Sequence, residues 1–156
     1  IKKLSSIKNV KGIKYTSMNH YEMQRIKEHI GPDFMIYSGA DEMCVSGLMM
    51  GADGIIGSFY NLDPEIYIDI YRYILNKDYE SARERLVIAN DIVEICLKYG
   101  CYQSIRAGLK FMGIDSGIDR KPFKQLDEKQ LAKLKSELKE LKESKDINGV
   151  NVLDAL

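Results

Sequence analysis

Three short apolar runs, separated by two helical segments, fill the first 58 residues and constrain the fold more than any other feature of the sequence. The runs are residues 12–16, 34–39 and 54–58, and the helical segments between them are residues 19–30 and 41–50. Polar residues at 17–19 can cap the first segment, and Gly51 can close the second. Strand, helix, strand, helix, strand at this spacing predicts parallel strands joined by crossover helices.

Beyond these runs the sequence predicts only helices. Leucines recur between lysines and glutamates in the last of them, which is typical of an amphipathic surface helix rather than of a nucleic-acid or membrane segment. The stretch DRKPF at 119–123 is expected to connect this helix to the one before it. We predict two parts, residues 1–76 with three βα units and residues 77–156 as a helical extension. The expected helices are residues 64–76, 79–99, 102–112 and 127–145.

Composition favours a globular protein of one ordinary domain's size. The chain has 156 residues, 45% hydrophobic and 29% charged, and its 23 basic and 23 acidic residues cancel. No net charge attracts nucleic acid or an anionic membrane, so we expect a small molecule or a protein as partner. Three cysteines without paired spacing indicate a reducing compartment, and no apolar run resembles a secretory signal or a membrane span. A cytoplasmic location is therefore expected.

Three strands are few for an independent parallel sheet. Parallel sheets are normally covered on both faces, and their edges are normally paired or protected. The strands predicted here leave the outer edges open. The sequence therefore looks incomplete as a fold.

A lysine occupies the first of the predicted strands. Side chains alternate between the faces of a strand, so Ile13 and Tyr15 share one face, and Gly12, Lys14 and Thr16 share the other. A strand lysine usually lies at an edge, where its ammonium reaches solvent. A pocket that desolvates the amine would instead make it a Schiff-base nucleophile for carbonyl substrates. The alternation alone leaves both interpretations open.

Polar residues follow the second and third predicted strands. Asp41 can cap a helix and Glu42 can lie in its first turn, or the pair can accept hydrogen bonds from ligand hydroxyls. In the glycine-rich stretch GADGIIGSFYN, the glycines permit close backbone approach and Ser58 can donate a hydrogen bond. His20 and His29 lack a third ligand at metal spacing, so no metal site is expected.

Taken together, these motifs resemble a known family. GIKYTS, then YSGADE, then GADGIIGSFYN and finally RKPF, in this order over nearly the whole chain, resemble the pyruvate-dependent class I aldolases of the dihydrodipicolinate synthase and N-acetylneuraminate lyase family. The YTS after the lysine, the Asp-Glu pair and the GSxYN ending are more similar to the lyase branch than to the synthase branch.

The resemblance implies an α/β fold, the C-terminal part of a (βα)₈ TIM barrel with extra C-terminal helices, in which the three strands are strands six to eight. It makes Lys14 the Schiff-base residue. Phe59, where a small hydroxyl residue is frequent in the family, departs from the pattern. The residues that match the family's substrate-binding positions are Thr16, Gly39, Asp41, Glu42 and Ser58.

The resemblance also implies an activity, cleavage of N-acetylneuraminate to N-acetylmannosamine and pyruvate. No metal or organic cofactor is expected, because the iminium formed on Lys14 is the electron sink. A complete barrel needs about 250 residues. The loop that grips the pyruvate carboxylate and the proton-moving tyrosine are therefore expected in an N-terminal barrel portion, which is the expected partner besides the keto-sugar. A homo-oligomer, a tetramer in the family, is also expected.

Two alternatives stay open at this stage. The first is a related pyruvate-dependent aldolase, such as dihydrodipicolinate synthase or 2-keto-3-deoxygluconate aldolase. The second is that the isolated chain is an inactive fragment that acts only through association, because open strand edges can bind a partner or another copy.

Overall fold

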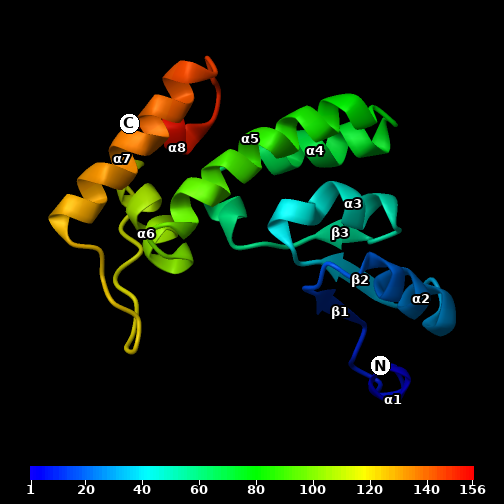
Figure 1. The fold of residues 1–156 in the computed structure, drawn as a ribbon. Coiled ribbons are helices and arrows are strands. Elements are labelled where there is room, and N and C mark those ends of the chain that lie inside the picture. Colours follow the sequence, from blue (N-terminus) through cyan, green and yellow to red (C-terminus); the bar gives the residue numbers. More distant parts are fainter.

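The computed structural model describes residues 1–156, and its sheet has the predicted parallel topology (Figure 1). The three strands pair in the order β1-β2-β3, with Lys14 opposite Tyr37 and Tyr37 opposite Gly54. Helical segments connect successive strands, as expected for crossover connections. The elements are β1 (Gly12–Tyr15), α2 (His20–Ile30), β2 (Met35–Ser38), the 3₁₀ helix η1 (Asp41–Met43), α3 (Cys44–Met49) and β3 (Gly54–Ile55).

The third strand is shorter than the sequence predicts. Residues 54–58 are expected to be extended, but only Gly54 and Ile55 form β3. Ser58 already has helical backbone angles, φ −77° and ψ −38°, and it precedes the 3₁₀ helix η2 (Phe59–Asn61). Because β3 pairs with β2 on one side only, few backbone hydrogen bonds hold this segment in the extended form.

The prediction that Asp41 caps a helix is wrong. Asp41 is the first residue of η1, whose N-cap position belongs to Ala40 and has no side-chain capping bond. The Asp41 carboxylate instead accepts a hydrogen bond from the backbone N–H of Phe59, at 2.8 Å. The carboxylate of Asp41 therefore pairs with the amide at the start of η2. It does not pair with amides of the helix that it was expected to cap.

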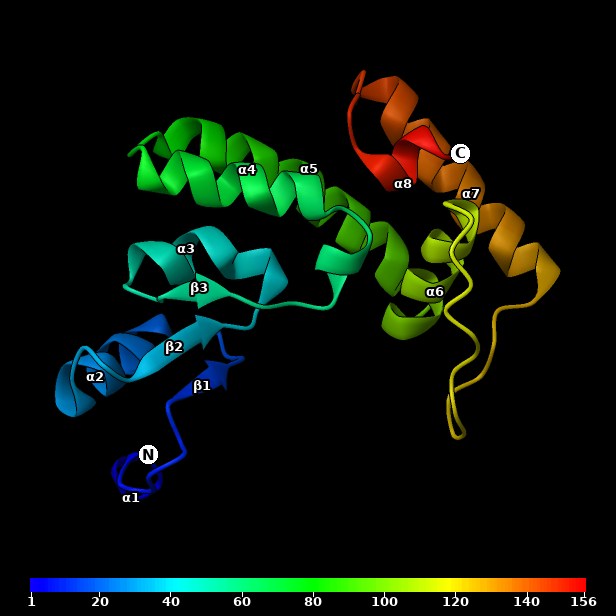
Figure 2. The same ribbon diagram turned by 180° about the vertical axis from the view of Figure 1, so that it is seen from behind.

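The helical region, α4 to α8, contains the four predicted helices with ends shifted by a few residues. Figures 1 and 2 show α4 and α5 side by side next to α3, with α6, α7 and α8 farther from the sheet. Two short helices, α1 and α8, were not predicted. None of the helices is both long and apolar enough to cross a membrane. The bounds are α1 (Lys2–Ser5), α4 (Pro64–Leu75), α5 (Tyr79–Leu97), α6 (Cys101–Phe111), α7 (Glu128–Ser144) and α8 (Asn151–Asp154).

Local capping explains where α7 starts. The Asp127 side chain accepts from the backbone N–H of Gln130 at 2.7 Å, and the Gln130 side chain accepts from the Asp127 N–H at 3.1 Å. This reciprocal pair satisfies two amides that the first turn cannot pair by itself. Leu134 and Leu138 then point into the core, as the amphipathic pattern predicts.

Two cores of very different size hold the molecule together. The larger has 19 buried residues, among them Ile66, Ile92 and Leu138. The smaller consists of Met23, Phe34 and Ile36, against which Ile13 and Tyr15 of β1 pack, among other side chains. These contacts confirm that Ile13 and Tyr15 face the helices, so the opposite face of the sheet, which carries Lys14, is the uncovered one.

Candidate functional site

The residues that follow the three strands line one pocket of about 310 Å³. Because parallel strands end at the same edge of the sheet, the segments after β1, β2 and β3 are brought together there. The pocket unites all five residues that the resemblance assigns to the substrate, although they come from three separate segments. These residues are Thr16, Gly39, Asp41, Glu42 and Ser58.

Lys14 stands on β1 beside this pocket, and its stem runs over the backbone of Gly39. A Cβ atom placed on Gly39 would lie 2.7 Å from Lys14 Cε and would overlap Thr16 Oγ1. The two side chains therefore share one face of the sheet, and glycine at position 39 makes the room that they need. Any larger residue there would displace the lysine stem or the threonine hydroxyl.

The environment of Lys14 differs from the desolvated pocket expected for a Schiff-base lysine. The side chain is exposed, and its ammonium makes no hydrogen bond or ion pair in the structure. The physical reason is its position: β1 is an edge of the sheet, with β2 on one side and no strand on the other. Within these 156 residues Lys14 therefore has the exposed edge position, which is one of the two interpretations that the alternation left open.

Asp41 is held firmly at the base of the pocket. Only 6% of the residue is exposed, and its Oδ2 accepts from the Phe59 N–H. Burial raises the pKa of Asp41, while the Phe59 hydrogen bond opposes that rise. Glu42 also acts to raise this pKa, and the positive charge of Lys14 acts to lower it. The Asp41 carboxylate is thus fixed in orientation and feels the charge of Lys14.

Gly57 is part of the site, although the sequence pattern did not single out this glycine. The glycine-rich stretch predicts close backbone approach, and at Gly57 a Cβ atom would overlap the Asp41 carboxylate. The carboxylate therefore lies against bare backbone between Gly57 and the Phe59 amide. A side chain at position 57 would move the carboxylate out of this place.

Glu42 and Ser58 have free polar groups at the pocket. The Glu42 side chain is exposed and makes no hydrogen bond, whereas its main-chain carbonyl accepts from Asn90 Nδ2 at 3.4 Å. The Ser58 carbonyl accepts from the Asn61 side chain at 2.8 Å, and the Ser58 hydroxyl makes no hydrogen bond. A fixed carboxylate beside a free carboxylate and a free hydroxyl suits a ligand with several hydroxyl groups.

Three residues of the helical region form an apolar wall that sequence reasoning missed. Val93 and Leu97 come from α5, and Cys101 begins α6. Val93 also belongs to the large core, and no local signal in the sequence places these three residues opposite the strand ends. Burial raises the pKa of Cys101, and Asp41 and Glu42 raise it further, so the side chain is a neutral thiol. The pocket thus has one polar and one apolar wall.

The structure groups no three His, Cys, Asp or Glu side chains at positions where they could hold a metal ion. His20 is buried, and its Nδ1 lies 2.7 Å from the hydroxyl of Ser46 on α3. The polar groups at the strand ends are one primary amine, two carboxylates and several hydroxyls, and the Cys101 thiol lies on the opposite wall of the pocket. An amine is the group among these that can form an imine with a carbonyl substrate.

Known proteins with similar sequences include lyases of sialic acid. The chain is 36% identical over 132 residues to an N-acetylneuraminate lyase of Rhizobium meliloti, a match that covers 85% of this chain and 44% of that protein. It therefore spans less than half the length of this relative.

Solved structures give the same comparison in three dimensions. The wild-type sialic acid aldolase of Ruminococcus gnavus matches with a TM-score of 0.81 and 30% identity, over 88% of this chain and 47% of that one. The same aldolase has also been solved as a catalytic lysine mutant, with a TM-score of 0.74 and 28% identity over 83% of this chain and 44% of that one. N-acetylneuraminate lyase of Fusobacterium nucleatum, complexed with pyruvate, matches with a TM-score of 0.75 and 34% identity, over 85% and 44% of the two chains.

The family itself follows from the widest of these matches. Residues 1–141 match the model of the Dihydrodipicolinate synthetase family, which is most of the chain. The α/β fold with three parallel strands agrees with part of the TIM-barrel enzymes of this family. The chain belongs to the Dihydrodipicolinate synthetase family.

Proposed function

We propose that the chain supplies strands six to eight and the C-terminal helices of a TIM-barrel aldolase that cleaves N-acetylneuraminate to N-acetylmannosamine and pyruvate. The observation that carries this proposal is the placement of Lys14, whose stem packs on Gly39 beside a pocket that holds Asp41 and Glu42. An amine next to a hydroxyl-binding pocket is the arrangement that a keto-sugar aldolase needs.

The known activities of the relatives support the proposal. They include N-acetylneuraminate lyases, one of them solved with pyruvate, and a sialic acid aldolase with a catalytic lysine. In this sequence Lys14 is the lysine that stands on a strand at the mouth of the pocket. We therefore assign the Schiff-base role to Lys14.

In the proposed mechanism the neutral amine of Lys14 attacks the keto carbon of the substrate, and loss of water gives an imine. Protonation of the imine makes it an electron sink, so the carbon–carbon bond toward the sugar breaks and its electron pair forms an enamine. The former hydroxyl oxygen of the sugar carbon loses its proton and becomes the aldehyde of N-acetylmannosamine. The enamine then takes a proton on carbon, and water releases pyruvate and regenerates Lys14.

The other site residues have positioning roles in this proposal. Glu42 and Ser58 form hydrogen bonds with hydroxyls of the sugar part, and Asp41, fixed by the Phe59 amide, does the same from the base of the pocket. Thr16 lies beside Lys14 and orients the part of the substrate nearest to the imine. No metal or organic cofactor enters any of these steps.

We also propose that a second portion supplies the remaining strands of the barrel. Lys14 is exposed here, so a second portion with the other strands must enclose it and supply the proton-moving group and the carboxylate grip. We propose that the 156 residues alone are inactive, that the assembled enzyme is a homo-oligomer, and that it works in the cytoplasm.

A related keto-acid aldolase is the second candidate, because the family model is that of dihydrodipicolinate synthetases. The lyase substrate carries a polyol, whereas the substrates of the dihydrodipicolinate synthase reaction do not. Glu42→Ala should weaken cleavage of a polyol substrate strongly and should have little effect on a substrate without one.

The test uses a completed chain, in which the part of the Fusobacterium nucleatum lyase outside the matched segment is joined to Ile1. Pyruvate release is measured with N-acetylneuraminate and with 2-keto-3-deoxygluconate, and pyruvate consumption is measured in the dihydrodipicolinate synthase reaction. We expect turnover of N-acetylneuraminate that Lys14→Arg abolishes. Turnover of another substrate alone would reject the sialic acid assignment, and unchanged turnover in Lys14→Arg would reject the mechanism.

A further inference from the structure

A histidine is buried behind the sheet, at the start of α2. His20 is 6% exposed, and its Nδ1 lies 2.7 Å from the hydroxyl oxygen of Ser46 on α3. Neither residue lines the candidate pocket, and the proposed mechanism uses neither of them. A buried hydrogen bond between side chains fixes the two segments that it joins. Here it joins the start of α2 to α3.

The residue after Ser46 connects this hydrogen bond to the sheet. Gly47 is buried, and a Cβ atom placed on it would lie 2.6 Å from Ser38 Cβ and would overlap Ser38 Oγ. The same atom would lie 3.8 Å from His20 Cε1, which is an ordinary contact distance. The backbone of α3 therefore lies directly on the last side chain of β2, with the imidazole beside it.

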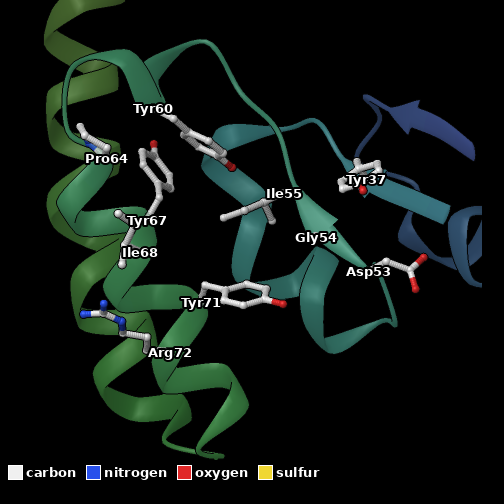
Figure 3. Close-up of a pocket in the computed structure, with 10 residues that line it drawn as sticks. All are labelled: Tyr37, Asp53, Gly54, Ile55, Tyr60, Pro64, Tyr67, Ile68, Tyr71 and Arg72. Atoms are coloured by element: carbon white, nitrogen blue, oxygen red, sulfur yellow. The ribbon is translucent and has the colours of Figure 1, made fainter.

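Ser38 and its neighbour Gly39 connect the two faces of the sheet. Tyr37, which is 39% exposed, lies next to Gly54 on the open face (Figure 3), whereas Ser38 is fully buried against α3. Gly39 faces the open side again, where its backbone lies against the stem of Lys14. Because adjacent residues of one backbone move together, a shift of Ser38 also shifts the surface on which the Lys14 stem lies.

Few main-chain hydrogen bonds hold the end of β2. The Gly39 N–H donates to the Tyr15 carbonyl, and the Ile56 N–H donates to the Ser38 carbonyl, each at 2.9 Å. Both neighbouring strands are edges of the sheet, and hydrogen bonds near strand ends open more easily than those inside a core. The packing of α3 on Ser38 is therefore an important support at this point.

We propose that His20 is a positioning residue for Lys14. Its hydrogen bond to Ser46 holds α3 on Ser38, and this contact fixes the backbone of Gly39 beneath the lysine stem. The inference rests on the proposed function, because it takes Lys14 as the reacting amine. It adds a residue that acts from the helix side of the sheet without touching the substrate.

This position of His20 predicts an effect on rate rather than on affinity. A small displacement of a reacting group lowers the rate of a reaction strongly. The Asp41 carboxylate in the pocket has its own support, the Phe59 amide. Loss of the His20 hydrogen bond should therefore lower kcat and leave KM nearly unchanged.

The test measures pyruvate release from N-acetylneuraminate by variants of the completed chain. His20→Leu removes both ring nitrogens, and Ser46→Ala removes the same hydrogen bond from its other partner. His20→Asn keeps a polar atom near the place of Nδ1. His29→Leu is the matched control, because His29 lies on the same helix, is exposed and has its Nε2 3.2 Å from the side chain of Arg25.

We expect kcat to fall at least about fivefold in His20→Leu and Ser46→Ala, with KM within about twofold of the unmodified value. The loss should be smaller in His20→Asn and absent in His29→Leu. Unchanged kcat in Ser46→Ala, a change in KM alone, or an equal loss in the control would overturn the proposal. Circular dichroism checks that each variant keeps its helices, and Ser46→Ala decides the question if His20→Leu does not fold.

Hydrogen exchange in the 156-residue chain separates this inference from the proposed function, because it needs no substrate. The amides of Gly39 and Ile56 should exchange several-fold faster in His20→Leu and Ser46→Ala. The amide of Met35, which donates to the sheet at the other end of β2, should not change. Faster exchange without turnover of the unmodified completed chain would reject only the function. Unchanged exchange together with turnover would reject only the positioning role.

Discussion

The helical region of this molecule buries a large core, whereas the strand region buries a small one and leaves its edges open. The helical region, α4 to α8, closes around most of a core of 19 buried residues, whereas the core on the covered face of the sheet has three. The strands have two open edges and one bare face, and that face carries Lys14. The proposed chemistry is therefore located on the less covered part of the molecule.

The two regions supply different walls of the site. The polar side of the pocket comes from the ends of the strands, and its apolar wall comes from α5 and α6. Because α5 belongs to the large core, it gives the strand ends a rigid neighbour. We infer that this core holds α5 and α6, and with them the apolar wall of the site, in place.

The largest effect should come from opening the large core. Ile92 is fully buried in α5, so Ile92→Ala should lower the free energy of unfolding by about 2–5 kcal/mol. Ile13 of β1 is only half-buried, so Ile13→Ala should cost clearly less. Denaturant unfolding monitored by circular dichroism measures both changes. Equal losses would contradict the contrast between the two regions.

The second effect is a dependence of stability on pH at the start of α4. Asp63 is fully buried without a hydrogen-bond partner, and burial, helped by Glu65, raises its pKa from 3.8 to about 8. A carboxyl with a raised folded-state pKa contributes stability that is complete below its unfolded pKa and is lost as the pH rises to the folded value. Stability should therefore fall between about pH 4 and pH 8, by up to about 1.4 kcal/mol per pH unit.

Asp63→Asn provides the control for that dependence. Asparagine is also a good N-cap residue, so the helix keeps its start while the titrating group is removed. Thermal unfolding from pH 4 to pH 8 should show a flatter profile for Asp63→Asn than for the unmodified chain. Parallel profiles would show that Asp63 does not titrate in this range.

A smaller effect is expected where the Asp41 carboxylate lies on Gly57. Gly57→Ala forces the carboxylate to move, which should cost about 1–3 kcal/mol of stability and weaken sugar binding in the completed chain. The double substitution with Asp41→Ala should cost less than the sum of the two single changes, because the clash is then gone. Strict additivity would mean that position 57 acts independently of the carboxylate.

The smallest effect tests a contact between the turn that follows α5 and helix α7. The Tyr99 hydroxyl donates to Glu137 at 2.5 Å, and this hydrogen bond, with some burial, raises the pKa of Tyr99 to about 12. Tyr99→Phe should lower stability by about 1 kcal/mol. Tyr102→Phe, at a half-exposed tyrosine without a hydrogen bond, should change it very little. A thermal melt compares the two variants.

Much of the fold could be predicted from the sequence because its signals are local. The alternation around Lys14 predicted that Ile13 and Tyr15 share one face of β1, and the spacing of apolar runs and helical segments predicted parallel strands. The leucine spacing of the last long helix predicted Leu134 and Leu138 in the core. Each of these properties depends on residues a few positions apart.

The features that were missed depend on contacts between distant segments. Local rules predict that Asp41 caps a helix. Its carboxylate instead accepts a hydrogen bond from the amide of Phe59, 18 residues away. Val93 and Cys101 line the pocket only because α5 and α6 pack over the strand ends. The exposure of Lys14 follows from the position of β1 at an edge of the sheet. No local pattern reports any of these three.

The central claim, that Lys14 forms the Schiff base, is tested most directly by covalent trapping. The completed chain is incubated with pyruvate, reduced with borohydride, cleaved into peptides and analysed by mass spectrometry. We expect one reduced pyruvate adduct on the peptide that carries Lys14, and no adduct in a Lys14→Arg variant. An adduct on another lysine, an adduct that persists in Lys14→Arg, or no adduct at all would contradict it.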